Sequence, residues 1–254
     1  TVQKTLIDSV SKFLLENTTI PIINLKPDLL EAKEKQLVYF KTDTHWNMEG
    51  VFLGYNSICN QLDLSGITHS SPIEITKSPA FHVGDLTVML NNILPPEPYN
   101  LIQIVNANSV KIESGSYYDL LNNLIQKNVN NNRPFYIYKN QTTEKRKILI
   151  YGDSFFGSFI MPQLFAENFS EMDFIWSRQI MKNELDLIKP DLVILEVTER
   201  YIPLLEMPPD PQLSDTLLHD PKSEIISSTL PSSFISGEKY NFSVTVRNNG
   251  TETW

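Results

Sequence analysis

Hydrophobic positions change period several times in the first quarter of the chain, which predicts an alternation of helices and strands. Apolar residues recur at helical spacing over residues 1–16 and again over 47–62, with polar residues between them. The short apolar runs 20–25 and 36–40 predict buried strands. Pro27 suits the first turn of a further helix between them, because proline needs no hydrogen-bond partner there. Helix, strand, helix, strand is the order of an α/β layer.

The strongest strand signals come later. Lys147–Tyr151 is an unbroken apolar run of the kind that is buried on both faces of a parallel sheet, and it stops at Gly152-Asp153-Ser154, where a helix is expected. A second buried strand is predicted over residues 191–197, after a helix near Met181–Ile188 that Pro190 terminates. We therefore expect an α/β fold, with a doubly wound, mostly parallel sheet flanked by helices.

Residues 64–146 show a weaker pattern. Short β-like runs lie among Asn, Pro and Ser, at residues 73–75, 101–105 and 135–138. Residues 128–132 are a loop by composition. We interpret the whole segment as an excursion from the core.

Beyond residue 206 the composition changes. Residues 207–231, which contain many Pro and Ser, predict a linker after the domain 1–206. Apolar and polar residues then alternate from Tyr240 to Val246, which predicts a half-buried strand ended by Asn248-Asn249-Gly250. A strand and the start of its partner bury no core alone. Residues 232–254, with "VRNNGTETW", therefore resemble the first strands of a truncated immunoglobulin-like β-sandwich module.

Charge and cysteine content exclude several classes of protein. The chain has 254 residues and a net charge of −9, from 21 Lys and Arg against 30 Asp and Glu, so no broad basic surface suits a nucleic acid. Cys59 is the single cysteine, which excludes a disulfide framework, and it is expected to be a buried thiol. No apolar run approaches the roughly 20 residues of a membrane span. The chain opens with Thr1 rather than Met, which leaves room for a leader or anchor upstream.

The first candidate site is Lys41-Thr42-Asp43-Thr44-His45-Trp46, after a predicted strand. Residues two apart in extended chain point to the same side, so the Asp43 carboxylate can meet the His45 imidazole. Such a bond orients the ring and leaves its other nitrogen free to take a proton. Capping, a solvated loop and a metal-ligand pair are the alternatives. No second His or Cys pair at ligand spacing accompanies the motif, which disfavours a metal.

The second candidate is Gly152-Asp153-Ser154-Phe155, where a buried strand turns toward a helix. A serine at the carboxyl end of such a strand lies where open α/β sheets bind ligands. The N–H groups at the helix start are available to stabilise an oxyanion, and the backbone N–H of Ser154 is the first choice. The alternative is a simple turn with a helix cap. A serine nucleophile needs an oriented base, so the two candidates together predict catalysis better than either does alone.

Four segments, in this order, resemble the alginate O-acetyltransferase family (AlgJ/AlgX-like), relatives of the SGNH hydrolases: "YFKTDTHWNMEG", "HVGDLTVML", "ILIYGDSFFGSF" and "PDLVILEVTERYI". The resemblance covers about residues 1–206. In ordinary SGNH hydrolases the Ser block precedes the Asp/His pair, whereas in this family, as here, the pair comes first. Such proteins usually have an earlier sheet strand and an export or membrane signal, so domain 1–206 is expected to be incomplete at its amino end.

The resemblance implies a triad of Ser154 as nucleophile, His45 as base and Asp43 as its partner. It also implies a polysaccharide acceptor, an extracytoplasmic location (periplasmic, cell-surface or secreted) and a membrane-bound O-acyltransferase as the partner that supplies acetyl groups. No cofactor beyond the acetyl donor and no metal are expected. A polysaccharide acetyl esterase with the same triad and a non-catalytic carbohydrate-binding scaffold are the alternatives.

Further residues are weaker candidates. Arg178 is a possible anion-facing group beside the oxyanion, or else a surface ion-pair partner. Arg200 and Tyr201, in the "ER" segment of the family, either line the site or begin a helix with an ion pair. Trp46 either stacks on a sugar or packs in the core. The remaining histidines have no acidic residue at a useful spacing and are expected on the surface or in loops: His69, His82 and His219.

Overall fold

The computed structural model describes residues 5–64, 73–89, 94–128, 133–141, 145–205, 223–229 and 243–248. The chain divides into two compact units, residues 1–206 and 207–254. In the described part of the first unit a five-stranded sheet has the order β3-β4-β6-β5-β7. Its strands are β3 (Ser109–Ile112), β4 (Phe135–Asn140), β5 (Lys147–Gly152), β6 (Glu171–Trp176) and β7 (Leu192–Leu195).

The sheet is mixed rather than wholly parallel. β5 pairs in parallel with both β6 and β7. β4 is antiparallel to β6 and to β3, so it alone runs against the other four strands. The predicted α/β sheet is confirmed in this coarser form, and the parallel part is the half that carries the strand before Ser154.

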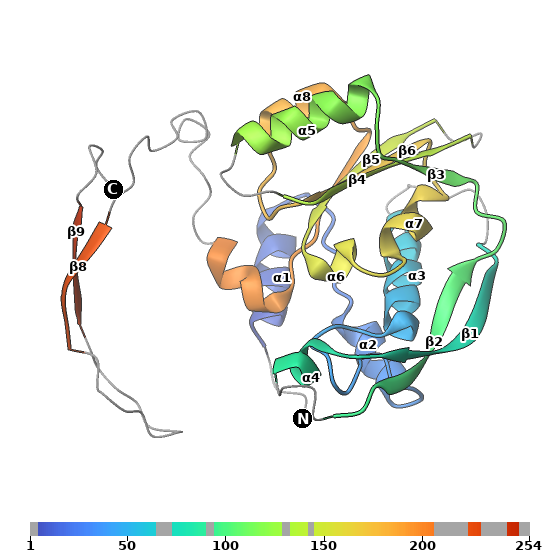
Figure 1. Cartoon of the computed structure of the whole chain (residues 1–254), viewed down its shortest axis with the longest axis horizontal. Helices are drawn as coiled ribbons and strands as arrows, with labels where there is room; N and C mark the ends of the chain where they lie inside the picture. The colour runs from blue at the N-terminus through green and yellow to red at the C-terminus, as the bar shows by residue number, and fades with distance from the viewer. Residues whose placement is uncertain are drawn as a thin grey trace. The chain divides into compact units, whose positions relative to one another are not determined.

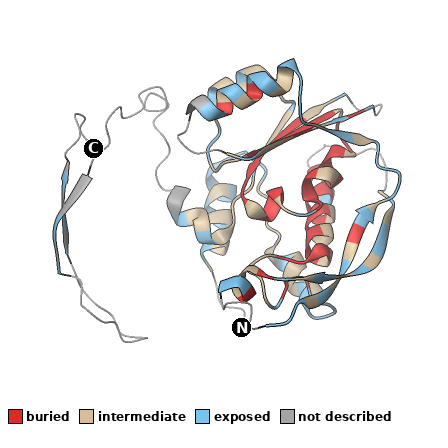
Figure 2. Cartoon of the chain, in the orientation of Figure 1, coloured by how far each residue is buried: buried red, intermediate tan, exposed pale blue. Residues whose placement is uncertain are grey.

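Helices cover both faces of the sheet, with α5 (Ser116–Asn128) and α8 (Lys182–Ile188) on one face and α3 (Met48–Leu64), α6 (Ser154–Gly157) and α7 (Met161–Ala166) on the other (Figure 1). Side chains of β5 alternate between the two layers. Ile148 and Ile150 join the core that contains α3 and α7, whereas Leu149 and Tyr151 pack with α5. β5 is therefore buried on both faces, as its apolar run predicts (Figure 2).

Several predicted elements agree with the structure. α1 spans Leu6–Asn17, α2 spans Lys26–Lys33 with proline in its first turn, and α3 begins within a residue of the expected position. α8 ends at Ile188, and its cap Lys189 takes the left-handed conformation, with φ of 53°, directly before Pro190. β7 corresponds to the central part of the predicted strand 191–197.

Two predicted strands are wrong. Residues 20–25 form no strand, although Ile23 and Leu25 pack against the core. Pro21 removes a ladder donor from this run, and Ile23 and Leu25 are partly buried without strand pairing. Residues 36–40 contain only an isolated bridge, Tyr39 with Trp46, because the chain folds back on itself there rather than joining the sheet.

The interpretation of residues 64–146 as an excursion is wrong in its second half. β3, α5 and β4 belong to the central domain, and β4 pairs directly with β6. The many Asn residues of this segment obscured the helical spacing of Leu121 and Ile125, whose side chains on α5 are completely buried. β6 went unpredicted because Glu171 and Asp173 interrupt its apolar pattern. The predicted loop overlaps α5 at Asn128, and its other residues lie outside the described part of the chain.

The true excursion is an antiparallel pair, β1 (Ile75–His82) and β2 (Glu97–Ile104), with the short helix α4 (Asp85–Met89) between them. This segment packs on α3, chiefly through β2 (Figure 1). It leads directly to the candidate site, because β1 ends at His82 and α4 begins at Asp85.

The second unit contains β8 (Ser223–Ser228) and β9 (Val244–Asn248), which pair antiparallel. β9 agrees with part of the predicted alternating strand, whereas residues 240–242 and 249–250 lie outside the described residues. β8 falls inside the predicted linker 207–231, so that part of it is a strand. The pairing with β9 makes this segment a strand, and composition does not reveal such pairing. The immunoglobulin-like module stays a prediction. In the described part of the chain, no helix has both the length and the apolarity that crossing a membrane requires.

Candidate active site

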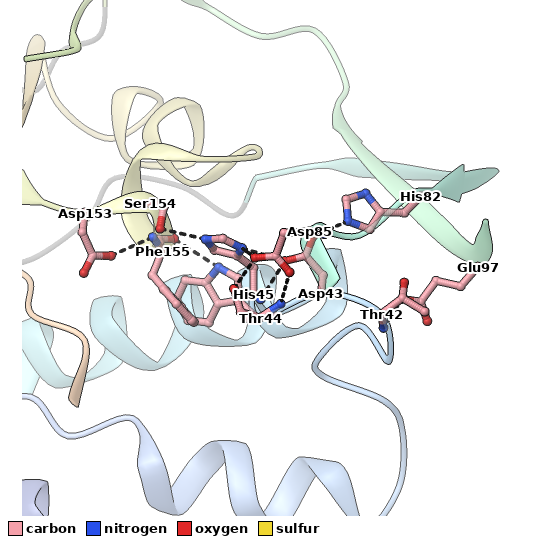
Figure 3. Close-up of polar contacts among 11 residues, drawn as sticks. Thr42, Asp43, Thr44, His45, His82, Asp85, Glu97, Asp153, Ser154 and Phe155 are labelled. Atoms are coloured by element: carbon pink, nitrogen blue, oxygen red, sulfur yellow. Dashed lines mark hydrogen bonds and ion pairs between the residues drawn. The ribbon is translucent and has the colours of Figure 1, made fainter. Parts of the chain in front are cut away.

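Three side chains predicted to act together lie in one hydrogen-bonded line (Figure 3). His45 Nδ1 is 2.7 Å from Asp43 Oδ1, and His45 Nε2 is 2.7 Å from Ser154 Oγ. Both distances are within ordinary hydrogen-bond range. The structure thus brings the nucleophile to a base and a carboxylate that lie more than a hundred residues before it in sequence.

The two halves of the line come from different kinds of backbone. Asp43 and His45 lie on the loop between α2 and α3, whereas Ser154 is the first residue of α6, directly after β5. Burial is graded along the line, since the side chain of Asp43 is 7% exposed and that of His45 is 18% exposed. The reacting end is therefore open to a substrate while the carboxylate is shielded from water.

Asp43 accepts four hydrogen bonds, two on each oxygen. Oδ1 accepts from the backbone N–H and the ring of His45, and Oδ2 accepts from His82 Nε2 at 2.7 Å and from the backbone N–H of Asp85. Burial alone would raise the pKa of Asp43, but the bonds from His82 and His45 outweigh it and lower the pKa to about 2. Asp43 is therefore a carboxylate with a single rotamer, as a partner of an imidazolium must be.

The segment β1–α4–β2 holds the loop that carries Asp43 and His45, through hydrogen bonds to several residues of that loop. Glu97 of β2 accepts from the backbone N–H groups of Lys41 and Thr42. The side chain of Asp85 accepts from the backbone N–H of Thr44 at 2.9 Å (Figure 3). We call residues 75–89 and 94–104 the clamp, because they hold the loop through hydrogen bonds to its backbone.

Gly84 gives the clamp its closest approach to the loop. A Cβ at this position would lie 1.9 Å from the carbonyl oxygen of Thr42 and 2.7 Å from the backbone nitrogen of Asp43. The next residues donate across the same gap, since Leu86 N lies 3.1 Å from Thr42 O. Only glycine fits here, although its φ requires no left-handed conformation.

Ser154 is held by the residues around its turn. Asp153 caps α6 by accepting from the backbone N–H of Phe155 at 2.9 Å. Thr198, after β7, donates to the other oxygen of Asp153, and Glu196 accepts from the backbone N–H of Asp153. Burial, with the nearby charge of Asp153, raises the pKa of Glu196 to about 8. The predicted helix cap thus coexists with the nucleophile position, because Asp153 does the capping.

Among the described residues the backbone N–H of Ser154 has no hydrogen-bond acceptor. It lies at the start of α6, on the carboxyl side of β5. A backbone donor at this position is suited to an oxyanion that forms on a carbon attached to Ser154 Oγ.

Of the two alternatives for Trp46, the structure supports packing in the core rather than stacking on a sugar. Trp46 is only 5% exposed and belongs to the core that surrounds α3. Its Nε1 donates to the carbonyl oxygen of Phe155 at 3.1 Å, and its ring packs against the Phe155 ring. Trp46 therefore links the loop that carries His45 to the turn that carries Ser154. Its ring is buried and has no face available for a ligand.

Arg178, Arg200 and Tyr201 gather in one cluster. The guanidinium carbon of Arg178 lies 4.4 Å, and that of Arg200 5.0 Å, from the centroid of the Tyr201 ring. Arg200 also lies 5.4 Å from the ring centroid of Phe155, the residue after the nucleophile. Within the described ranges neither arginine forms an ion pair, so the predicted surface salt bridge of Arg178 and helix-starting ion pair of Arg200 are both missing there.

His82 was wrongly expected to lack an acidic partner. It contacts Asp43 across 39 residues of sequence, a separation that no local spacing rule detects. The family-like segment "HVGDL" was the available signal, since it contains His82, Gly84 and Asp85. His69 and His219 lie outside the described residues, and Cys59 is buried, as predicted.

One group of side chains warrants a test as a metal site. Atoms of Asp43, His45 and Asp85 lie within 4.8 Å of one another. The ring nitrogens of His45 already contact Asp43 and Ser154 at hydrogen-bond distance, and Asp85 accepts from Thr44. These atoms are engaged with donors in the protein, so the geometry fits a hydrogen-bonded line better than a set of metal ligands.

Comparison with known proteins agrees with the family resemblance. Residues 6–129 match the family model described as an SGNH hydrolase-like domain, acetyltransferase AlgX. The matched range contains Asp43, His45 and His82 but not Ser154. The comparison with curated proteins finds no match.

Three solved structures are similar to this chain. PatB1 of Bacillus cereus has a TM-score of 0.53 and 19% identity, over 78% of this chain and 76% of that one. A DHHW family protein from Eubacterium siraeum has a TM-score of 0.52 and 11% identity, over 76% and 69%. The O-acetyltransferase domain of Pseudomonas putida AlgJ has a TM-score of 0.47 and 15% identity, over 84% and 74%.

At these identities the first two structures establish a shared fold, and the family model adds the relationship in sequence. Over residues 6–129 the chain is thus similar in sequence to the SGNH hydrolase-like AlgX acetyltransferases, in agreement with the AlgJ/AlgX-like resemblance of its motifs.

Proposed function

We propose that this protein is an extracytoplasmic O-acetyltransferase that moves an acetyl group, through a Ser154 acetyl-enzyme, onto hydroxyls of a cell-surface or secreted polysaccharide. The observation that carries the proposal is the line from Ser154 Oγ through His45 to Asp43, with 2.7 Å at each step. The relationship to the AlgX acetyltransferases supports acetyl transfer as the reaction.

In the first half-reaction Ser154 Oγ attacks the carbonyl carbon of an acetyl ester while His45 Nε2 takes the hydroxyl proton. The carbonyl oxygen becomes an oxyanion, which accepts from the backbone N–H of Ser154. The tetrahedral intermediate collapses as the ester bond to the donor breaks, and His45 gives its proton to the departing alcohol. Asp43 stabilises the imidazolium throughout without taking the proton itself.

In the second half-reaction a sugar hydroxyl gives its proton to His45 and attacks the acetyl carbon. The bond to Ser154 Oγ then breaks, and His45 returns the proton to Ser154. Water competes at this step, and transfer requires that the sugar occupies the site long enough to react first. The same triad with water as acceptor would be an acetyl esterase, and some side hydrolysis is expected.

Arg178, Arg200 and Tyr201 complete the proposal on the acceptor side. The two guanidinium groups, which have no ion-pair partner in the described part of the chain, give this edge of the site a positive character within a protein of net charge −9. Arg178 is proposed to face an anionic group, and Arg200 and Tyr201 to contact the acceptor. A membrane-bound O-acyltransferase is the proposed source of acetyl groups.

Acetyl transfer and hydrolysis are separated with a chromogenic acetyl ester, offered with and without oligosaccharides. We expect acetylated oligosaccharide by mass spectrometry and an acetyl adduct on the peptide that contains Ser154. Ser154→Ala should abolish both. Brisk hydrolysis with no transfer to any glycan would favour the esterase, and an unreactive wild-type serine would favour the non-catalytic scaffold.

A further inference from the structure

His82 contacts the triad from the side opposite to His45. It is the last residue of β1, and its Nε2 lies 2.7 Å from Asp43 Oδ2 (Figure 3). His45 contacts the other oxygen of the same carboxylate. Ser154, His45, Asp43 and His82 therefore form one continuous series of hydrogen bonds, with the carboxylate at its third position.

We infer that His82 is a positioning residue of the active site, which fixes the rotamer of Asp43 and restrains the basicity of His45. The inference rests on the proposed roles of Ser154, His45 and Asp43. It adds a residue from the clamp, so the excursion between α3 and β3 takes part in setting the chemistry of the base.

The ring of His82 is itself immobilised. It stacks on Phe40 with 4.0 Å between centroids and 22° between planes, and Tyr99 and Phe159 approach it from other sides. In the antiparallel pairing of β1 with β2, His82 lies opposite Glu97. Stacking fixes the plane of the ring, and the direction of its Nε2–H is fixed with it. A donor held in this way limits rotation of the Asp43 carboxylate.

The charged groups around His82 determine its role as a donor. Asp43 faces it from the loop and Glu97 from β2, while Tyr99 offers a neutral phenol. Asp85 of α4 donates its backbone N–H to the same oxygen of Asp43, and its carboxylate accepts from Thr44. Because Asp43 is ionised, the His82 nitrogen that faces it carries a proton and donates. This hydrogen bond draws electron density from the carboxylate, so Asp43 attracts the His45 imidazolium less strongly than it would alone.

Two consequences follow from the loss of this donor. Asp43 gains rotational freedom, so His45 spends less time in line with Ser154 and turnover falls at every pH. The carboxylate also becomes a stronger partner of the imidazolium, so the acidic limb of the pH profile moves to higher pH. Loss of a residue with a merely structural role would lower the rate without moving the acidic limb of the pH profile.

Two substitutions separate these effects. His82→Phe keeps a ring on Phe40 but has no donor, whereas His82→Gln places an amide N–H near the position of Nε2. Phe81→Leu is the matched control, because it changes the neighbouring aromatic residue of β1, which is exposed, and removes no hydrogen bond to Asp43. His82→Leu is a second loss variant should His82→Phe fail to fold, and melting curves report folding for all four proteins.

The rate constant for sulfonylation of Ser154 by phenylmethylsulfonyl fluoride is measured from about pH 5 to pH 9, across the range where histidine titrates. The modified serine is located by mass spectrometry, and kcat and KM for a chromogenic acetyl ester are measured in parallel. We expect His82→Phe to lower the labelling rate and kcat by about 10- to 100-fold, with KM unchanged and the acidic limb at higher pH. His82→Gln should recover to within about threefold of wild type, with Phe81→Leu similar.

A wild-type rate and pH profile in His82→Phe would overturn the inference, and so would equal losses in His82→Phe and His82→Gln with no movement of the limb. Failure of the proposed function looks different, because the wild-type serine would then label no faster than Ser154→Ala. In that case nitrogen NMR spectra of the His45 ring, recorded across the same pH range, still test His82. Spectra of His82→Phe identical to those of the wild type would then refute the role.

Discussion

Gly84→Ala tests whether the clamp positions the base of the active site. The added methyl carbon would lie 1.9 Å from the carbonyl oxygen of Thr42, where ordinary van der Waals contact begins at 3.4 Å. Its neighbours are backbone atoms on both sides, which have no rotamer to change. Loop and clamp must therefore separate by about 1.5 Å, and the bonds from Leu86 N to Thr42 O and from Asp85 N to Asp43 lengthen with them.

A displacement of this size is large for catalysis. A misplacement of about 1 Å costs on the order of 100-fold in rate, or roughly 2.7 kcal/mol of activation free energy. We expect kcat for a chromogenic acetyl ester to fall by about 100-fold or more. The free energy of unfolding should fall by about 1–3 kcal/mol, as for other overpacked positions, and the domain should still fold.

Gly115→Ala is the matched control. Gly115 has φ of 110°, and an added Cβ there meets nothing within 4 Å, so alanine costs backbone strain of about 1 kcal/mol without touching the loop. Steady-state kinetics and thermal melting are measured for both variants. If Gly84→Ala were folded and within about threefold of wild-type kcat, or if Gly115→Ala lost as much activity, the clamp would not position the base.

Three more expectations follow from the structure. Asp43→Asn removes the charge that stabilises the imidazolium, so kcat should fall by roughly 10⁴-fold with KM little changed in steady-state kinetics, and a loss below tenfold would contradict the role of Asp43. Burial, with the charge of Glu171, raises the pKa of Asp173 to about 8, so its contribution to stability is present below the ordinary value of 3.8 and is lost as pH rises to 8. Asp173→Asn, which can still accept from Tyr117, should therefore stabilise the domain against urea at pH 8 more than at pH 4, and an equal effect at both would count against this reasoning. Trp46→Phe removes the donor to Phe155 O and should lower the free energy of unfolding by about 1–3 kcal/mol while glycan binding, measured by calorimetry, stays unchanged.

Local sequence was enough for the elements whose signals are complete within a few residues. The spacing of apolar residues predicted α1 and α3, proline marked the start of α2, and the run Lys147–Tyr151 marked β5. The two halves of the candidate site were also readable, since Asp43 and His45 are two residues apart and Ser154 follows a buried strand. Each of these inferences depends on neighbours in sequence, whose geometry the backbone restricts.

Tertiary structure decided what depends on distant partners. The apolar runs 20–25 and 36–40 have the composition of strands, but a strand exists only where another strand offers a ladder of donors and acceptors, and these runs have none. In the same way α5 was obscured by composition, and it became visible only through packing on the sheet. The β-like run 135–138 was predicted, but only the fold placed it in the central sheet beside β6.

The candidate site divides in the same way, into residues that the sequence identifies and contacts that only the fold creates. The sequence by itself supplied a serine, a histidine and an aspartate of the right chemistry, together with a family resemblance. Only the folded chain determined that Ser154 meets His45, that Trp46 is buried, and that His82 and Gly84 hold the loop of Asp43. These contacts span 39 to 109 residues of chain, and hydrogen bonds and close packing at such separations are properties of the fold rather than of any local pattern.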